Sequence, residues 1–228
     1  TQPTITRLVN SLIKIGALRE GEKSVSSQIG RPPSMIELVP ETAYSVGFHV
    51  TASSMEFALV NLKGEVFVKE AEAFAEGVSP EFVLCWAENV YHRTLRKKGI
   101  DEERVLGAGL GVAGVVDNKR GINTVAYNLR WQDVPLGSRL QKMLGIPVIV
   151  ESNVRAMALA EKWFGVGRRG IDDFLVLYVG TGVGGAIVVG GNLHLGRGAA
   201  GEIGHTQVDP DGPLCSCGST GCLEVMVS

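Results

Sequence analysis

The sequence lacks the features that mark membrane proteins, secreted proteins and disulfide-rich scaffolds. No apolar run reaches the roughly 18–20 residues that a membrane-spanning helix needs. No charged segment followed by an apolar stretch opens the chain, as it would in a secretory signal peptide. Only 4 of the 228 residues are cysteine, too few for a scaffold held together by disulfides. We therefore expect a cytoplasmic protein with no membrane insertion.

A strong excess of charge is also missing. Lys and Arg together number 22 against 24 Asp and Glu, which gives a net charge of −2. The chain as a whole does not attract nucleic acid, so any DNA contact must come from a local patch. With 45% hydrophobic and 20% charged residues, the composition is that of a globular protein rather than a disordered one. Thr1 in place of an initiating Met, and an apolar run cut at Ser228, lead us to expect a piece of a longer protein.

Residues 1–40 predict the last part of a winged helix. Apolar side chains recur within residues 2–16 at the spacing of one helix face, and a strand at 17–20, a polar loop at 21–33 and a return strand at 35–39 would form the wing. A polar helix face is usually just solvated, so DNA binding is favoured only in combination with the features below. The candidate DNA contacts are polar or basic side chains that can read base edges or hold phosphates: Gln2, Thr4, Thr6, Arg7 and Asn10 on the helix, with Lys23 and Arg31 in the wing.

After Pro40 the pattern changes to strands interleaved with helices. This alternation predicts an α/β fold. We expect strands at 44–50, 55–61, 65–70, 105–112, 147–150, 173–179 and 185–190, and helices at 80–98, 134–144 and 152–164.

Three cysteines and a histidine crowd into one short segment, with the pattern Gly-His-x9-Cys-x-Cys-x4-Cys. Thiolates and imidazole are the ligands that Zn²⁺ prefers, and four protein ligands leave no open position on the metal. Unrelated thiols are the alternative, but such clustering in a cytoplasmic chain favours a metal. The sequence therefore predicts a structural zinc ion. Its ligands would be His205, Cys215, Cys217 and Cys222.

The segments Gly201–Pro210 (Gly-Glu-Ile-Gly-His-Thr-Gln-Val-Asp-Pro) and Cys215–Glu224 (Cys-Ser-Cys-Gly-Ser-Thr-Gly-Cys-Leu-Glu) carry a family resemblance. The chain resembles the ROK family (repressors, open reading frames, kinases), and in particular its repressor branch of glucose, N-acetylglucosamine and xylose regulators. The resemblance implies an actin/hexokinase-like (ribonuclease H-like) sugar-kinase fold of two lobes, preceded by a partial winged helix-turn-helix. Residues 1–40 would form the partial winged helix, 41–152 the first lobe, and 153–228 the start of the second.

The resemblance also implies a sugar site in the cleft between the lobes. Carboxylates, amides and hydroxyls suit this role, because a sugar hydroxyl both donates and accepts hydrogen bonds. His205 would serve twice, with one ring nitrogen on zinc and the other facing a sugar hydroxyl. By position, the sugar contacts would be Asn128, Ser152, Asn153, Glu202, His205 and Glu224.

Two departures from the family kinases argue against catalysis. Those kinases carry Glu-Asn-Asp at the lobe junction, with the Asp as general base, whereas this chain has Glu151-Ser152-Asn153, and an amide does not take up a proton. Their first phosphate loop, of type Asp-x-Gly-Gly-Thr, corresponds to His49–Ser53, where the Asp and both glycines are replaced. The glycine-rich segment Val179–Gly185 matches a phosphate loop of the kinases, but such turns commonly serve only to reverse a strand. We therefore expect no enzyme.

The leading hypothesis is a DNA-binding transcriptional regulator, a repressor of sugar metabolism or transport genes, that senses a sugar without phosphorylating it. Its partners would be operator DNA, a sugar effector and other copies of the chain, since the family resemblance and operator symmetry imply a homodimer or a higher homo-oligomer. One alternative is an ATP-dependent sugar kinase of the same family. Another is a sensor that leaves DNA by binding a protein such as a transporter subunit. The sequence names neither the sugar nor the operator.

Overall fold

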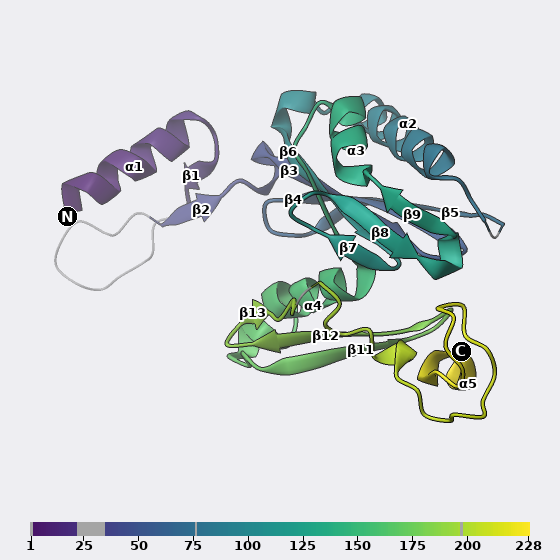
Figure 1. Cartoon of the computed structure of the whole chain (residues 1–228). Helices are drawn as coiled ribbons and strands as arrows, with labels where there is room; N and C mark the ends of the chain where they lie inside the picture. Colours follow the sequence, from purple (N-terminus) through teal and green to yellow (C-terminus); the bar gives the residue numbers. More distant parts are fainter. Residues whose placement is uncertain (1, 22–34, 76, 197) are drawn as a thin grey trace.

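The computed structural model describes residues 2–21, 35–75, 77–196 and 198–228, and its largest unit is an α/β lobe (Figure 1). The strands of the main sheet run in the order β10-β6-β3-β4-β5. β3, β4 and β5 form an antiparallel meander, and β6 and β10 lie parallel to β3. These strands are β3 (Tyr44–Val50), β4 (Ser54–Asn61), β5 (Val66–Ala73), β6 (Val105–Val112) and β10 (Val148–Ser152).

Alternating burial explains why these segments are strands. Every second residue of β3 and β4 is buried, and Phe48 and Phe57 pair across the two strands with ring centroids 5.5 Å apart. The helices α2 (Pro80–Lys98) and α3 (Leu136–Leu144) cover this face and complete the core (Figure 1). Ser79 caps α2 by accepting a hydrogen bond from the Phe82 N–H at 3.2 Å.

A small antiparallel sheet, which the sequence analysis did not predict, lies beside the main one. It consists of β7 (Val115–Asp117), β8 (Ile122–Ala126) and β9 (Trp131–Val134). The 3-10 turn η3 (Tyr127–Leu129) between β8 and β9 carries Asn128. The expected helix at 134–144 therefore begins two residues later, at Leu136. The buried Trp131 secures this sheet by donating its indole N–H to the Val78 carbonyl at 2.8 Å.

The second lobe starts with the helix α4 (Asn153–Phe164), followed by a sheet of order β11-β12-β13. Val154 and Ala158 of α4 pack against Ala186 and Val188 of this sheet. The last part of the chain is mostly turns and ends in α5 (Figure 1). The elements are β11 (Phe174–Val179), β12 (Val183–Val189), β13 (Asn192–Leu193) and α5 (Leu223–Val227), with the 3-10 turns η1 (Pro40–Thr42), η2 (Glu102–Arg104), η4 (Val166–Arg169) and η5 (Ile203–His205).

The N-terminal segment stands apart from the lobes (Figure 1). It contains α1 (Gln2–Lys14) and the antiparallel strands β1 (Leu18–Glu20) and β2 (Ile36–Leu38), which share the ion pair Arg19–Glu37 at 3.0 Å. The helix and the two strands that follow it occur in the predicted order. Lys23 and Arg31, predicted to contact DNA from the wing, lie outside the described residues. Within the described ranges, no helix is both long and apolar enough to cross a bilayer.

Candidate functional site

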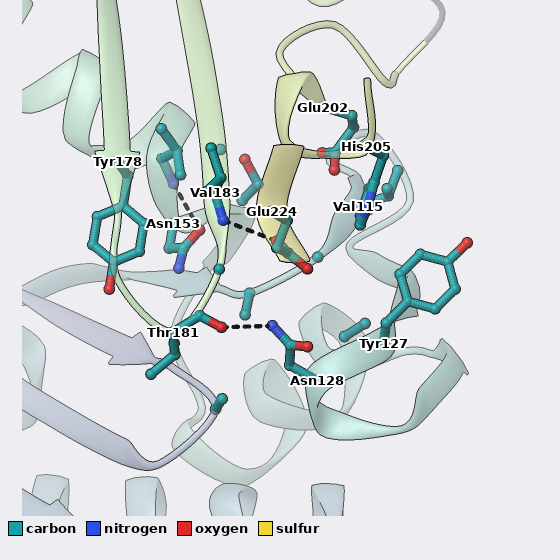
Figure 2. Close-up of a pocket in the computed structure, with 18 of the residues that line it drawn as sticks. Val115, Tyr127, Asn128, Asn153, Tyr178, Thr181, Val183, Glu202, His205 and Glu224 are labelled. Carbon is teal, nitrogen blue, oxygen red and sulfur yellow. Dashed lines mark hydrogen bonds between the residues drawn. The ribbon is translucent and has the colours of Figure 1, made fainter. Parts of the chain in front are cut away.

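A pocket opens between the two lobes, and several segments distant in sequence line it (Figure 2). The first lobe contributes the β3–β4 turn, the strands β7 and β8, and the turn η3. The second contributes the start of α4, the β11–β12 turn and the segment around η5 and α5. All the residues that the sequence predicted as sugar contacts converge here, namely Asn128, Ser152, Asn153, Glu202, His205 and Glu224.

Asn128 and Glu224 are both held by the β11–β12 turn (Figure 2). The Asn128 side-chain amide donates to the Thr181 carbonyl at 3.2 Å. The Glu224 carboxylate, in the first turn of α5, accepts the Val183 N–H at 2.8 Å and is 9% exposed. A buried carboxylate needs such a donor, because an unpaired charge in this environment is costly.

Ser152 and Asn153 are buried where β10 passes into α4. Ser152 caps the helix, and its hydroxyl oxygen accepts the Arg155 N–H at 3.4 Å. The Asn153 side-chain oxygen accepts the Val154 N–H at 2.8 Å. Both side chains thus combine a structural hydrogen bond at the helix start with a place on the pocket wall.

Sequence reasoning missed a buried ion pair next to these residues. Arg155 and Glu151 approach to 2.8 Å, with side chains 4% and 10% exposed. Arg155 also donates to the Val116 carbonyl at 3.0 Å, and Asn118 donates to Glu151 at 3.0 Å. The pair therefore ties α4 to β10 and to the small β7–β8–β9 sheet. No sequence pattern reveals the pair, because the i, i+4 spacing of opposite charges indicates a contact only within a helix, and Glu151 lies in β10.

Glu202, His205 and Tyr127 form another part of the pocket wall (Figure 2). Burial raises the pKa of the Glu202 carboxyl, an effect that the nearby His205 and Arg155 oppose. The Tyr127 and His205 rings are nearly perpendicular, with an interplanar angle of 85° and centroids 5.6 Å apart. Tyr127 was not predicted as a site residue, because a lone aromatic in a turn carries no distinguishing sequence pattern.

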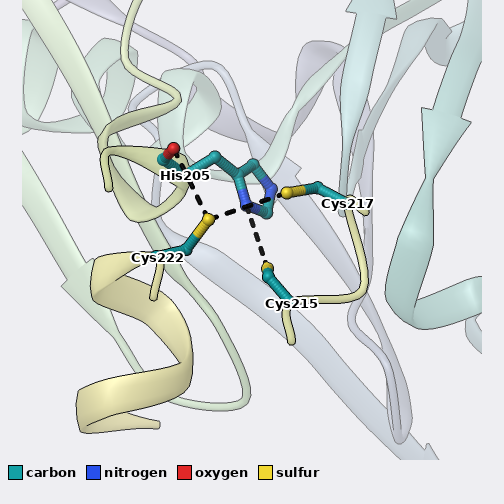
Figure 3. Close-up of side chains that lie close together, drawn as sticks. All are labelled: His205, Cys215, Cys217 and Cys222. Atoms are coloured by element: carbon teal, nitrogen blue, oxygen red, sulfur yellow. Dashed lines mark hydrogen bonds between the residues drawn. The ribbon is translucent and has the colours of Figure 1, made fainter. Parts of the chain in front are cut away.

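His205 also belongs to a cluster with the nearby cysteines (Figure 3). The ligand atoms of His205, Cys215, Cys217 and Cys222 all lie within 4.8 Å of one another. Sγ of Cys215 is 3.6 Å from Nδ1 of His205, and Sγ of Cys217 is 3.7 Å from Sγ of Cys222. This cluster could hold a metal ion.

The local backbone explains how the sulfurs converge. Gly221 has a φ of 60°, and a Cβ at this position would lie 1.5 Å from the Asp209 carbonyl oxygen, so only glycine fits. Burial raises the pKa of the Cys222 thiol to about 12. A bound cation would reverse this effect, since a metal deprotonates its thiol ligands. The remaining cysteine, Cys85, is exposed on α2 and does not belong to the cluster.

The segments matched to kinase phosphate loops lie at the same cleft. Thr51 and Ala52 of the β3–β4 turn line the pocket, and the Thr51 hydroxyl oxygen accepts the Ser54 N–H at 3.0 Å. His49 comes within 3.8 Å of Glu56, yet burial lowers the pKa of His49. In the glycine-rich segment, Gly182 lies in the turn between β11 and β12.

The family model described as "ROK family" matches residues 47–228. The chain belongs to the ROK family. This membership confirms the predicted actin/hexokinase-like α/β fold, and the best-covered relatives lie in the ROK repressor branch.

Three ROK relatives show how the similarity is distributed. The chain is 33% identical over 226 residues to the xylose repressor of Caldicellulosiruptor bescii, covering 99% of this chain and 56% of the repressor. It is 28% identical to the crystal structure of a ROK family transcriptional regulator, a homologue of the E. coli MLC protein, with a TM-score of 0.78 over 100% of this chain and 57% of that one. The ROK glucokinase of Streptomyces griseus, solved with glucose and AMPPNP, is 34% identical with a TM-score of 0.69, over 80% of this chain and 56% of the kinase. The chain thus spans little more than half the length of these ROK proteins.

Proposed function

We propose that this chain is the DNA-binding and sugar-sensing part of a transcriptional repressor, whose kinase-like cleft binds a sugar without phosphorylating it. The distribution of similarity carries the proposal. The ROK match begins at residue 47, yet the repressor alignment includes 226 of the 228 residues and so extends through the α1–β1–β2 segment. The glucokinase covers only 80% of the chain. The N-terminal segment is therefore shared with a regulator rather than needed by a sugar kinase.

The pocket chemistry supports a sugar ligand. Glu202 and Glu224 supply acceptors, Asn128 and Asn153 supply amides, and Ser152 supplies a hydroxyl, and all five line one pocket. Sugar hydroxyls donate and accept at once, so a pocket with both kinds of group can pair each of them. A pocket built this way also rejects analogues that lack a hydroxyl, because its buried polar groups would be left unpaired.

The same cleft lacks groups that phosphoryl transfer requires. The position of the family's catalytic Asp is occupied by Asn153, whose amide takes up no proton near neutral pH. Thr51 and Ala52 replace the two glycines of the first phosphate loop, and their side chains obstruct close approach of a phosphate to the backbone. Since positioning and charge stabilisation are nearly all that phosphoryl transfer asks of a protein, we infer that this cleft binds without catalysing.

We further propose that the His205–Cys222 cluster holds a structural zinc ion. A tetrahedron with Zn–S bonds of about 2.3 Å has S–S edges of about 3.8 Å. The Cys217–Cys222 separation of 3.7 Å matches that edge, and the slightly shorter Cys215–His205 separation of 3.6 Å suits the shorter Zn–N bond. With Nδ1 of His205 on the cysteine side, the other ring nitrogen can face the pocket, so zinc would orient a sugar contact as well as stabilise the fold.

The DNA contact would come from the polar face of α1. Thr6, Arg7 and Asn10 share this face with Ser11 and Lys14. In a symmetric dimer, two such helices would read half-sites about 34–36 Å apart, and a sugar that prefers one lobe arrangement would change their spacing. Gln2 and Thr4 lie on the same helix and are proposed as further contacts. Lys23 and Arg31 remain sequence-based candidates.

A thermal-shift experiment tests sugar sensing directly. The purified chain would be melted with D-xylose, D-glucose, N-acetyl-D-glucosamine and their 6- or 5-phosphates. A ligand at a hundred times its Kd stabilises by about 2.7 kcal/mol, which raises the melting temperature measurably. We expect Glu202→Ala to abolish the shift, and Glu103→Ala, which removes an exposed carboxylate on η2, to preserve it. The absence of a shift with every sugar would refute the sensing role.

The second candidate function is an ATP-dependent sugar kinase, which the similarity to the S. griseus glucokinase favours. A coupled assay for ADP release, run with each sugar and MgATP on the full-length protein, separates the two. The repressor proposal expects no sugar-dependent ADP. Turnover above the rate of a protein-free control would establish the kinase instead.

A further inference from the structure

We infer that the β11–β12 turn, Gly180–Val183, is a clasp that orients the sugar-contacting groups of both lobes rather than a cradle for nucleotide phosphate. This inference rests on the proposed sugar site. It assigns positioning roles to Thr181 and Gly182, which the sequence analysis treated only as part of a glycine-rich turn.

The first observation is that the turn holds one side chain from each lobe (Figure 2). Asn128, from η3 of the first lobe, donates its amide N–H to the Thr181 carbonyl at 3.2 Å. Glu224, from α5 of the second lobe, accepts the Val183 N–H at 2.8 Å. Each bond fixes the rotation of a side chain that lines the pocket. The Asn128–Thr181 bond also joins the first lobe to the second.

The second observation explains the glycine in the middle of the turn. A Cβ at residue 182 would lie 2.8 Å from Oε2 of Glu224 and 3.2 Å from Nδ2 of Asn128. Gly182 has no left-handed φ, so its backbone would accept an alanine. An added methyl group would instead push the ends of the two pocket side chains away from the turn.

The third observation concerns the backbone N–H groups that a phosphate cradle would need. The Val183 N–H already donates to Glu224, and the Gly180 N–H donates to the Gly182 carbonyl at 3.0 Å. A phosphate that took the Val183 N–H would have to displace the Glu224 carboxylate, which also carries negative charge. The Val183 N–H of the turn is thus already paired with a proposed sugar contact, Glu224.

The clasp couples sugar binding to the relative arrangement of the two lobes. A sugar that hydrogen-bonds Asn128 and Glu224 acts on the two side chains that the turn holds. Because Asn128 and Thr181 belong to different lobes, any change in the hydrogen bonds of Asn128 favours one lobe arrangement over another. The clasp therefore extends the sensing proposal, because it names the Asn128–Thr181 hydrogen bond as the contact through which sugar binding changes the arrangement of the lobes.

The test compares Gly182→Ala with the matched control Gly109→Ala, whose added methyl group meets no atom within 4 Å and whose φ is not left-handed. In the ligand-free chain, NMR hydrogen exchange of the Val183 amide reports the clasp. We expect Gly182→Ala to speed this exchange by at least about tenfold, because the bond to a charged acceptor is lost, and Gly109→Ala to leave it unchanged. Calorimetry with D-xylose and D-glucose should show an affinity loss of about tenfold or more for Gly182→Ala alone.

A second variant guards against misfolding of the first. Asn128→Asp keeps the side-chain size but replaces the donor to Thr181 with an acceptor, and we expect the same loss of sugar affinity. Unchanged Val183 exchange in Gly182→Ala would overturn the clasp, whatever the sugar does. Tight AMPPNP binding that Gly182→Ala abolishes would overturn it too, since the turn would then be a phosphate cradle. If no sugar binds the wild-type chain, the proposed function fails, while the exchange measurement still decides the clasp.

Discussion

At the scale of single residues, His205 connects the two parts of the site. Its Nδ1 lies 3.6 Å from Sγ of Cys215, its ring lies nearly perpendicular to that of Tyr127, and it lines the pocket between the lobes. The ring orientation is therefore set from the cysteine side and used on the pocket side. Loss of a metal at this cluster should disturb the pocket as well as the local fold.

Cys215→Ser tests the cluster as a metal site. Serine is a poor zinc ligand, so we expect the variant to lose its stoichiometric zinc and to melt about 10 °C lower, the shift that roughly 3 kcal/mol produces in a domain of this size. Cys85→Ser, which changes the exposed cysteine on α2, should keep both zinc and melting temperature. Elemental analysis and calorimetric melting measure the two quantities. Equal zinc content in the two variants would contradict the four-ligand site.

Residue-scale prediction of the site rested on sequence motifs. The Gly-His-x9-Cys-x-Cys-x4-Cys spacing and the family resemblance brought forward residues that the fold does place around one cleft. It failed for Tyr127 and for the buried Arg155–Glu151 pair, which no motif marks. Burial decides the importance of such side chains, and burial depends on segments far away in sequence.

At the scale of elements, α2 shows local signals at both ends. Ser79 caps the first turn, Pro80 suits the first helical position, and Gly99 ends the helix with a φ of 63°. The expected range 80–98 matches the structure for this reason. The β7–β8–β9 sheet carries no comparable signal, because strands as short as Val115–Asp117 do not show a clear alternation of apolar residues. Only their pairing makes them strands.

Ser79→Ala tests the α2 cap. The hydroxyl oxygen accepts the Phe82 N–H at 3.2 Å, and losing this bond should cost about 1 kcal/mol and lower the melting temperature by about 2–4 °C. Ser138→Ala is the matched control, because Ser138 is exposed on α3 and its hydroxyl bond to the Pro135 carbonyl is long, at 3.4 Å. Urea denaturation of both variants gives the free energies. A cost for Ser79→Ala no larger than that of Ser138→Ala would show that the cap contributes nothing.

At the scale of the whole molecule, the N-terminal segment stands apart from the two lobes (Figure 1). Two hydrogen bonds connect the turn after α1 to the residues that lead into the first lobe. The Thr42 hydroxyl donates to the Gly16 carbonyl at 2.7 Å, and the Val39 N–H donates to the Ala17 carbonyl at 2.9 Å. On α1, Ile5 is 63% and Leu8 56% exposed, so the described residues do not cover its apolar stripe. None of the described residues of this segment belongs to the main hydrophobic core.

Removing residues 1–39 tests this independence. Because the core and pocket lie within residues 40–228, we expect the shortened chain to melt within about 3 °C of the original and to keep its sugar-induced shift. Deleting residues 1–50 is the contrasting variant, since it removes β3 from the middle of the main sheet and should prevent folding. Differential scanning fluorimetry with and without D-xylose or D-glucose measures both. Loss of the shift in the first deletion would mean that the N-terminal segment contributes to the pocket.

The sequence alone determined the α/β alternation, the caps of α2 and the metal-ligand motif, since each of these depends on neighbours within a few positions along the chain. Only the tertiary structure decided that Asn128 and Glu224, nearly a hundred residues apart, are held by one turn, and that Arg155 and Glu151 are buried together. Packing of one lobe against the other sets those contacts, and no local pattern of residues specifies such packing.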